Sequence, residues 1–323
     1  MEQYELKPNA TSHIIEVLRA RHKLLRDMRN FFNSHDYLEV ETPNLVRTSP
    51  PDPHIDPLEV FIGDRGPFYL HTSPEMHMKK LLQHGVERIF QICKVYRVEE
   101  FEEIHNVEFT MLEWYRKGTY EDAMEETEEL VRNCFSDSHS ALYEEFTVFD
   151  LEELVYSATG INPFGLDRDA FYHSLRQKNF PGIDEGDDWN SLFFKLFIRE
   201  VERTLPPDKP YFIKNWPSSI STMAKMKDKN KVERFELYIN GLEIANGYTE
   251  LLDSAEQMKR FINDNKERER LGKKAFEIDG KFIRALLPLK GSYTGVSLGI
   301  DRLLMILLGK KAIGEVLIDR VKA

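Results

Sequence analysis

The sequence predicts an α+β fold built on a mainly antiparallel sheet that is flanked by helices. The strand-like segments are long, and helices do not separate them at the regular intervals of a doubly wound parallel sheet. Asn240-Gly241 lies between two apolar runs, which is the strongest short signal for an antiparallel hairpin. A long amphipathic helix opens the chain, with apolar residues at helical spacing from Ile14 to Phe32.

Short helices and strands follow in the first third of the chain. The alternation in YLEVETP predicts a strand that Pro43 closes, and four prolines within residues 49–57 predict an ordered loop. Two short strands flank Asp64-Arg65-Gly66. Ser73-Pro74-Glu75 is typical of a helix start. Strands are expected at 88–99 and 108–115, joined by an acidic loop.

The second part of the chain begins with helices and returns to strands. Residues 120–135 and 150–204 are mostly helical, and we interpret about 120–205 as an insertion into a single domain that spans 1–323. After Pro206-Pro207, the pattern predicts strands at 211–216, 233–239 and 242–251, helices at 254–271 and 278–287, and a last strand and helix at 292–299 and 301–309.

Composition narrows the class of protein. The 323 residues are 41% hydrophobic and 11% aromatic, enough for a sizeable core. A net charge of −11 argues against a general binder of nucleic acids or membrane surfaces. The two cysteines are too few for a disulfide framework or a thiolate zinc site, and no signal peptide or membrane span is apparent. We therefore expect a cytoplasmic protein.

The predicted hairpin at 233–251 brings two carboxylates together. With a two-residue turn, Ile239 faces Leu242, and Glu236 becomes the diagonal neighbour of Glu243 on one face of the sheet. A divalent cation would satisfy both carboxylates, although a solvated outer face is the alternative. In a regular strand, Asn246 and Glu250 point to the face opposite that of Glu243. They therefore reach the same site only if a bulge lies near Asn246-Gly247.

Alternation along the strands at 88–99 and 108–115 suggests a binding face. Arg97 shares a face with Glu99, and Phe109 shares one with Glu113 and Tyr115. Arg97 is suited to a phosphate or carboxylate, Phe109 to stacking on a purine, and Glu113 with Tyr115 to an ammonium group. An ordinary surface hairpin is the alternative.

A serine hydrolase is excluded by chain order. Residues 295–299 match the GxSxG pattern around Ser297, in the strand-to-helix context of a nucleophile elbow. In that fold a histidine follows the serine, whereas all ten histidines here lie at or before His173. Ser297 is better explained by packing at this junction or by a place in a pocket wall.

Several motifs together resemble a known family. They are YLEVETP at 37–43, TSPE at 72–75, Arg97-x-Glu99, His105-Asn106, FTMLEWY at 109–115, GLEIANGYTEL at 241–251 and Gly295-x-x-x-Gly299-x-Asp301-Arg302. In this order they resemble motifs 1, 2 and 3 of the class II aminoacyl-tRNA synthetases, and TSPE and EIANGYTEL resemble the lysyl branch. Only about ten residues precede the first helix, so we expect no anticodon-binding domain and negligible affinity for tRNA. In this respect the chain resembles the elongation factor P β-lysine ligases, truncated paralogues of lysyl-tRNA synthetase.

The resemblance implies a role for each matching residue. Arg97 would bind the α-phosphate and the substrate carboxylate, Arg302 the γ-phosphate, and Glu236 and Glu243 a Mg²⁺ ion. The other ATP-binding positions would be Glu99 at the adenine amino group, Phe109 stacked on the ring, His105, Asn106 and Gly299. The lysine-like substrate would meet Glu113, Tyr115 and Glu250 at its distal ammonium, Glu75 beside Ser73 at its other amino group, Asn246 at its carboxylate, and Ser297 in the pocket wall.

The implied reaction is ATP-dependent activation of (R)-β-lysine to an adenylate, followed by transfer to a lysine side chain of elongation factor P. Two alternatives remain open: a free-standing lysyl-tRNA synthetase-like enzyme that acylates another acceptor, and an inactive synthetase-like binding module. A homodimer is also expected, because the helix of motif 1 packs across a two-fold axis in this class. Ser297 stands where the synthetases have glycine, which favours β-lysine over α-lysine.

Overall fold

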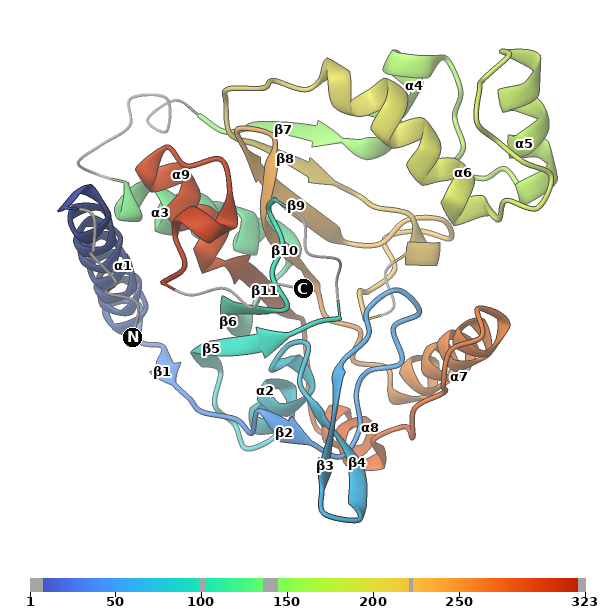
Figure 1. The fold of residues 1–323 in the computed structure, drawn as a ribbon. Helices are drawn as coiled ribbons and strands as arrows, with labels where there is room; N and C mark the ends of the chain where they lie inside the picture. The colour runs from blue at the N-terminus through green and yellow to red at the C-terminus, as the bar shows by residue number, and fades with distance from the viewer. Residues whose placement is uncertain (1–7, 99–102, 136–144, 221–222, 319–323) are drawn as a thin grey trace.

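An eight-stranded sheet forms the centre of the molecule (Figure 1). The computed structural model describes residues 8–98, 103–135, 145–220 and 223–318, with side chains from residue 13 onwards. The outermost pairs, β1 with β5 and β7 with β8, are parallel, and the other pairs are antiparallel. In spatial order the strands are β1 (Leu38–Glu39), β5 (Arg88–Tyr96), β6 (Glu108–Lys117), β11 (Tyr293–Gly299), β10 (Leu242–Thr249), β9 (Arg234–Ile239), β8 (Tyr211–Lys214) and β7 (Thr147–Asp150). The prediction of a mainly antiparallel sheet is confirmed.

A second, three-stranded sheet projects below the first in Figure 1. It consists of β2 (Leu45–Val46), β4 (Arg65–Leu70) and β3 (Leu58–Ile62), so the two strands predicted around residues 64–66 are confirmed. The proline-rich segment 49–57 is a loop, as predicted. It is attached to the rest of the fold by Asp56, which pairs with Arg268 at 2.7 Å and with Lys273 at 2.8 Å.

Three groups of helices cover the large sheet (Figure 1). One face packs against α1 (Pro8–Ser34), α3 (Tyr120–Cys134) and α9 (Ile300–Leu308), in a core that includes Phe90 and Trp114. A second cluster joins α2 (Glu75–Leu82), α7 (Ser254–Arg270) and α8 (Gly280–Leu286) to Tyr115 and Tyr293. A third joins α4 (Leu151–Thr159), α5 (Arg168–Gln177) and α6 (Trp189–Leu196) to β8. Within the described ranges, no helix combines the length and apolar content needed to cross a membrane.

The predicted helices and strands are present, and several of the strands are shorter than predicted. Only Leu38 and Glu39 of YLEVETP form a strand, because β1 is an edge strand that pairs with β5 over two residues. β5 ends at Tyr96, so Arg97 lies just after the strand and not within it. The N–H of Arg97 still donates to the carbonyl oxygen of Val107 at 3.0 Å, as in a strand pair. The side chain of Arg97 therefore keeps the orientation that strand alternation predicts, and it lines the cavity described below.

The hairpin between β9 and β10 has the predicted turn but a different bulge. Asn240 and Gly241 have φ of 52° and 73°, as a mirror-image two-residue turn requires. The bulge lies between Glu243 and Ala245, and not at Asn246-Gly247 as predicted. Gly247 instead makes room for a neighbouring strand, because a Cβ there would lie 2.7 Å from the Phe235 ring.

The bulge changes the register beyond it. Glu236 pairs with Asn246, whereas the regular hairpin would have paired it with Ala245. As a result Glu243 and Asn246, which have opposite parity in the sequence, both reach the same cavity. The prediction that a bulge is needed was right, and its position was wrong.

Asp301 connects the site face of the sheet to α1. Its side chain is 2% exposed and pairs with Arg21 at 2.5 Å, and it accepts a hydrogen bond from the N–H of Thr110 at 2.6 Å. Replacing Asp301 by alanine removes the acceptor of the Thr110 N–H and the carboxylate partner of Arg21, whose side chain is 19% exposed. We predict that Asp301→Ala lowers the free energy of unfolding by about 2–4 kcal/mol, measured by urea denaturation.

Asp169→Ala is the control, because the Asp169 side chain is 87% exposed and pairs only with its neighbour Arg168 among the described ion pairs. Its free energy of unfolding should change by less than about 0.5 kcal/mol. Equal stability of the two variants would contradict the role of Asp301.

Candidate active site

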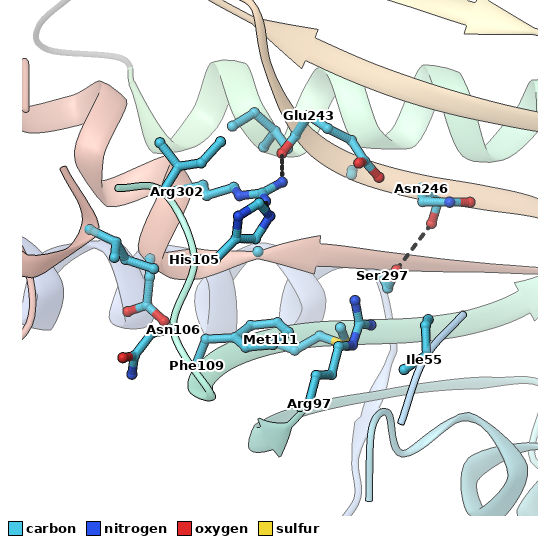
Figure 2. Close-up of a pocket in the computed structure, with 16 residues that line it drawn as sticks. Ile55, Arg97, His105, Asn106, Phe109, Met111, Glu243, Asn246, Ser297 and Arg302 are labelled. Carbon is cyan, nitrogen blue, oxygen red and sulfur yellow. Dashed lines mark hydrogen bonds between the residues drawn. The ribbon is translucent and has the colours of Figure 1, made fainter. Parts of the chain in front are cut away.

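A cavity of about 340 Å³ is lined by residues of β6, β10 and β11, by the segment 104–106 and by the start of α9 (Figure 2). It contains most of the residues predicted to bind a nucleotide: Arg97, His105, Asn106, Phe109, Glu243, Gly299 and Arg302. Asn246 and Ser297 also line it. Glu236 lies beside it on β9, and Glu99 lies outside the described residues.

Strand alternation explains how these side chains reach one face. On β6, Leu112 and Trp114 enter the core shared with α1, so Met111 and Glu113 point to the opposite face. β11 runs beside β6 with Ser297 opposite Glu113. The register of the strands therefore fixes which side chains meet in the cavity.

Two arginines face the nucleotide part of the cavity from different elements. The guanidinium of Arg97 lies over the Phe109 ring at 5.2 Å from its centroid, and its Nε donates to the carbonyl oxygen of Thr72 at 3.2 Å. Arg302 donates to the carbonyl oxygen of Glu243 at 2.9 Å and lies 2.7 Å from Nε2 of His105. Figure 2 shows Arg302 with His105 on one side and Arg97 with Phe109 on the other. This arrangement suits a base and a polyphosphate.

Glu236 and Glu243 form a pair that could hold a cation. Glu236 is 5% exposed and accepts hydrogen bonds from Arg234 and, at 2.7 Å, from Tyr238. Burial, and then the negative charge of Glu243, raise the pKa of Glu236. The two carboxylates are thus close enough to repel, as the predicted hairpin implied. Within the described residues no three metal-ligating side chains form a cluster, so a divalent ion here would need ligands from a bound molecule.

A second group of residues, with buried carboxylates, lies beyond Ser297; we call it the amine subsite after the ligand group that the sequence predicts for it. Glu113 is 2% exposed and accepts hydrogen bonds from Ser73 at 2.8 Å and from Tyr115 at 2.5 Å. Glu250 is also 2% exposed. A Cβ on Gly295 would lie 2.6 Å from Oε1 of Glu250 and closer still to the Tyr115 ring, so only glycine leaves this space open.

Burial raises the pKa of two carboxyl groups of the amine subsite, Glu113 and Glu250. Burial raises the pKa of Glu250 to about 8, with Lys79 opposing the shift and Glu75 adding to it. Burial and then the charge of Glu75 raise the pKa of Glu113, against the hydrogen bonds from Tyr115 and Ser73. Within the described residues, Oε1 of Glu250 is buried without a hydrogen-bond partner. A cationic ligand would favour the ionised form of each group.

Sequence reasoning missed three residues of this subsite: Lys79, Tyr248 and Gly295. The ammonium of Lys79 lies 2.5 Å from Oε1 of Glu75 and also pairs with Glu250. Its spacing of four residues from Glu75 on a helix is a signal that could have found it. Tyr248 has the parity of Asn246 and Glu250, and its hydroxyl donates to Glu75.

Comparisons with known proteins identify the family of the chain. Residues 4–318 match the family described as tRNA synthetases class II (D, K and N). The chain is 37% identical over 329 residues to an elongation factor P–(R)-β-lysine ligase of Avibacterium paragallinarum, covering 98% of each chain. Proteins of the same name from Histophilus somni strain 2336 and Actinobacillus succinogenes are 37% and 36% identical, and this chain covers 94% and 97% of their lengths.

The raised pKa values predict how ligand affinity depends on pH. Below about pH 8 the free subsite holds a proton on Glu250, and binding an ammonium group requires that this proton leave. We predict that the affinity for a diamino acid such as β-lysine increases from about pH 6 to pH 8, measured by titration calorimetry, and falls again only when the ligand's own ammonium groups titrate.

Glu250→Gln is the matched variant, because it keeps the shape of the side chain and removes its titration. Its affinity should be lower and should depend less on pH. An affinity that is constant from about pH 6 to pH 8 in the unmodified protein would contradict the assignment.

Proposed function

Because the chain belongs to the class II tRNA synthetases (D, K and N), we propose that it activates (R)-β-lysine with ATP and transfers it to a lysine side chain of elongation factor P. One observation carries the proposal: a buried subsite with the carboxylates Glu75, Glu113 and Glu250 adjoins the nucleotide cavity. The names of the relatives support the choice of amino acid and acceptor.

Activation joins the amino-acid carboxylate to the α-phosphorus of ATP and releases pyrophosphate. Arg97 would bind the α-phosphate and the carboxylate, and Arg302 would contact the γ-phosphate. Glu236 and Glu243 would hold Mg²⁺, which neutralises phosphate charge when bound. These residues act by positioning and charge neutralisation, so no protein nucleophile is required.

Transfer breaks the bond between the acyl carbon and the phosphate oxygen of the adenylate. The acceptor amine attacks the acyl carbon, AMP leaves, and the amine loses a proton as the amide forms. Glu113 and Glu250 would hold the distal ammonium of β-lysine, Glu75 its β-ammonium and Asn246 its carboxylate.

Within the described residues, Cys93 and Cys134 are free thiols, which supports a reducing cytoplasm as the place of the reaction.

The proposal is tested by the intact mass of elongation factor P after incubation with the enzyme, ATP, Mg²⁺ and (R)-β-lysine. We predict a mass increase of one β-lysyl group. Glu243→Ala should abolish most of the modification and the Mg²⁺-dependent exchange of pyrophosphate into ATP, because one of the paired carboxylates is lost.

Lys225→Ala is a control outside the pocket, since Lys225 is half exposed and pairs with Glu233 on the surface. It should modify elongation factor P like the unmodified enzyme. If the enzyme exchanges pyrophosphate into ATP but the mass of elongation factor P does not change, elongation factor P is not the acceptor.

The preference between the two lysines should depend on Ser297. Ser297 on β11 lies opposite Glu113 on β6 and opposite Asn246 on β10, at the junction of the cavity and the amine subsite. Its Oγ lies 3.4 Å from the carbonyl oxygen of Asn246. We predict that Ser297→Gly shifts the ratio of kcat/KM for β-lysine and α-lysine towards α-lysine by about 1–3 kcal/mol. An unchanged ratio would leave Ser297 with a packing role.

We also propose that the protein is a homodimer. Support comes from an apolar patch on α1, where Ile14, Ile15 and Leu18 are 38–43% exposed. We predict that light scattering at micromolar concentration gives twice the mass of the chain, and that Leu18→Glu shifts the protein to monomer. A monomer in the unmodified protein would refute the proposal, and a dimer unaffected by Leu18→Glu would place the interface elsewhere.

A further inference from the structure

A lysine side chain of the protein itself is buried in the amine subsite. Lys79 lies on α2, is 2% exposed and extends its ammonium group between Glu75 and Glu250. The ring centroids of Tyr248 and Tyr115 lie 5.3 Å and 5.9 Å from its Nζ, and Sδ of Met223 lies at 3.7 Å. This cation is thus enclosed on every described side by carboxylates, aromatic rings and a thioether.

The charges of the subsite do not balance without a ligand. Three carboxyl groups, Glu75, Glu113 and Glu250, influence one another through their charges. Among the described ion pairs, Lys79 is the only cation that contacts any of them. If all three carboxyl groups are ionised and Lys79 is protonated, the subsite keeps a net charge of −2.

We propose that Lys79 is a positioning residue that supplies one built-in positive charge and thereby fits the subsite to a ligand with two ammonium groups. The inference rests on the proposed function and specifies why a diamino acid is accepted. A lysine-like substrate brings the two positive charges that the three carboxylates and Lys79 still need.

The contacts of Lys79 leave one oxygen of Glu250 and one of Glu75 without a contact to it. Lys79 pairs with Oε2 of Glu250, while Oε1 of Glu250 is buried against Gly295 and has no hydrogen-bond partner among the described residues. On Glu75, both Lys79 and the hydroxyl of Tyr248 donate to Oε1. Glu113 is held by neutral donors, so its charge is available to a ligand. Lys79 therefore orients Glu75 and Glu250 and makes no ion pair with Glu113 among those described.

The titratable groups that face Lys79 are Glu75 on α2, Glu113 and Tyr115 on β6, Tyr248 on β10 and Glu250 just after β10. Burial opposes the charge of Lys79, but Glu250 and Glu75 outweigh it and raise the pKa of Lys79. The charge of Lys79 in turn lowers the pKa of Glu250. Removing that charge should leave Glu250 protonated up to a higher pH.

The test compares Lys79→Met, which keeps the length of the side chain, with Lys79→Arg and with Lys80→Met. Lys80 is the next residue on the helix and pairs with Asp279 at 2.7 Å, away from the three carboxylates. In pyrophosphate exchange, Lys79→Met should raise the KM for β-lysine at least about tenfold at neutral pH and leave the KM for ATP within about twofold. The pH above which the KM for β-lysine levels off should also move upward. Lys79→Arg should restore the pH profile, and Lys80→Met should match the unmodified enzyme.

A measurement without substrate covers the case in which Lys79→Met folds poorly. The loss of melting temperature in Lys79→Met should widen from about pH 6 to pH 8.5, because ionised carboxylates then lack their counter-charge. The double variant Lys79→Met/Glu250→Gln should recover part of that loss, since removing both partners of a buried pair costs less than removing one.

The outcomes separate this inference from the proposed function. Absence of exchange with either lysine in the unmodified enzyme would overturn the proposed function. An active enzyme whose KM for β-lysine and pH profile are unchanged in Lys79→Met would overturn the role of Lys79. A melting difference that is constant with pH, with no recovery in the double variant, would overturn it as well.

Discussion

Buried carboxylates that the protein neutralises only in part are the constraint on which the site depends. Glu113, Glu236 and Glu250 lie in the middle or at the end of sheet strands and are at most 5% exposed. Burying such groups without full pairing is costly, and the cost appears as raised pKa values. Cations brought by ligands would complete the pairing. The rest of the fold supplies the rigid sheet that holds these groups together.

Residues of the central strand β11 contact both parts of the site, one after the other along the strand. Gly295, Ser297 and Gly299 occupy alternate positions and therefore share one face of the sheet. Gly295 lies at the amine subsite, Ser297 at the junction, and Gly299 at the nucleotide cavity. Successive positions on this face are about 6.6 Å apart, which matches a short amino acid lying beside a nucleotide. The order proposed for the substrate's groups follows this strand geometry.

Sequence reasoning predicted those features of the site that depend on local pattern. The alternation of 109–115 was enough to place Phe109, Glu113 and Tyr115 on one face, and Asn240-Gly241 was enough to place the turn between β9 and β10. The bulge at Glu243–Ala245 could not be placed, because the register of β10 on β9 depends on contacts between the strands and not on local pattern. Lys79 was missed for the same reason: its role depends on Glu250, which is distant in sequence and joins it only through the fold.

The central claim is that the subsite needs two ammonium groups to balance its charge. The most direct measurement compares the affinity of (R)-β-lysine with that of ε-aminocaproate, which has the same chain, carboxylate and distal ammonium but lacks the β-amino group. Calorimetry in the presence of a non-hydrolysable ATP analogue would give both values under one condition. We predict that ε-aminocaproate binds at least about a hundredfold more weakly, because one buried carboxylate stays uncompensated. Equal affinity of the two ligands would contradict the account.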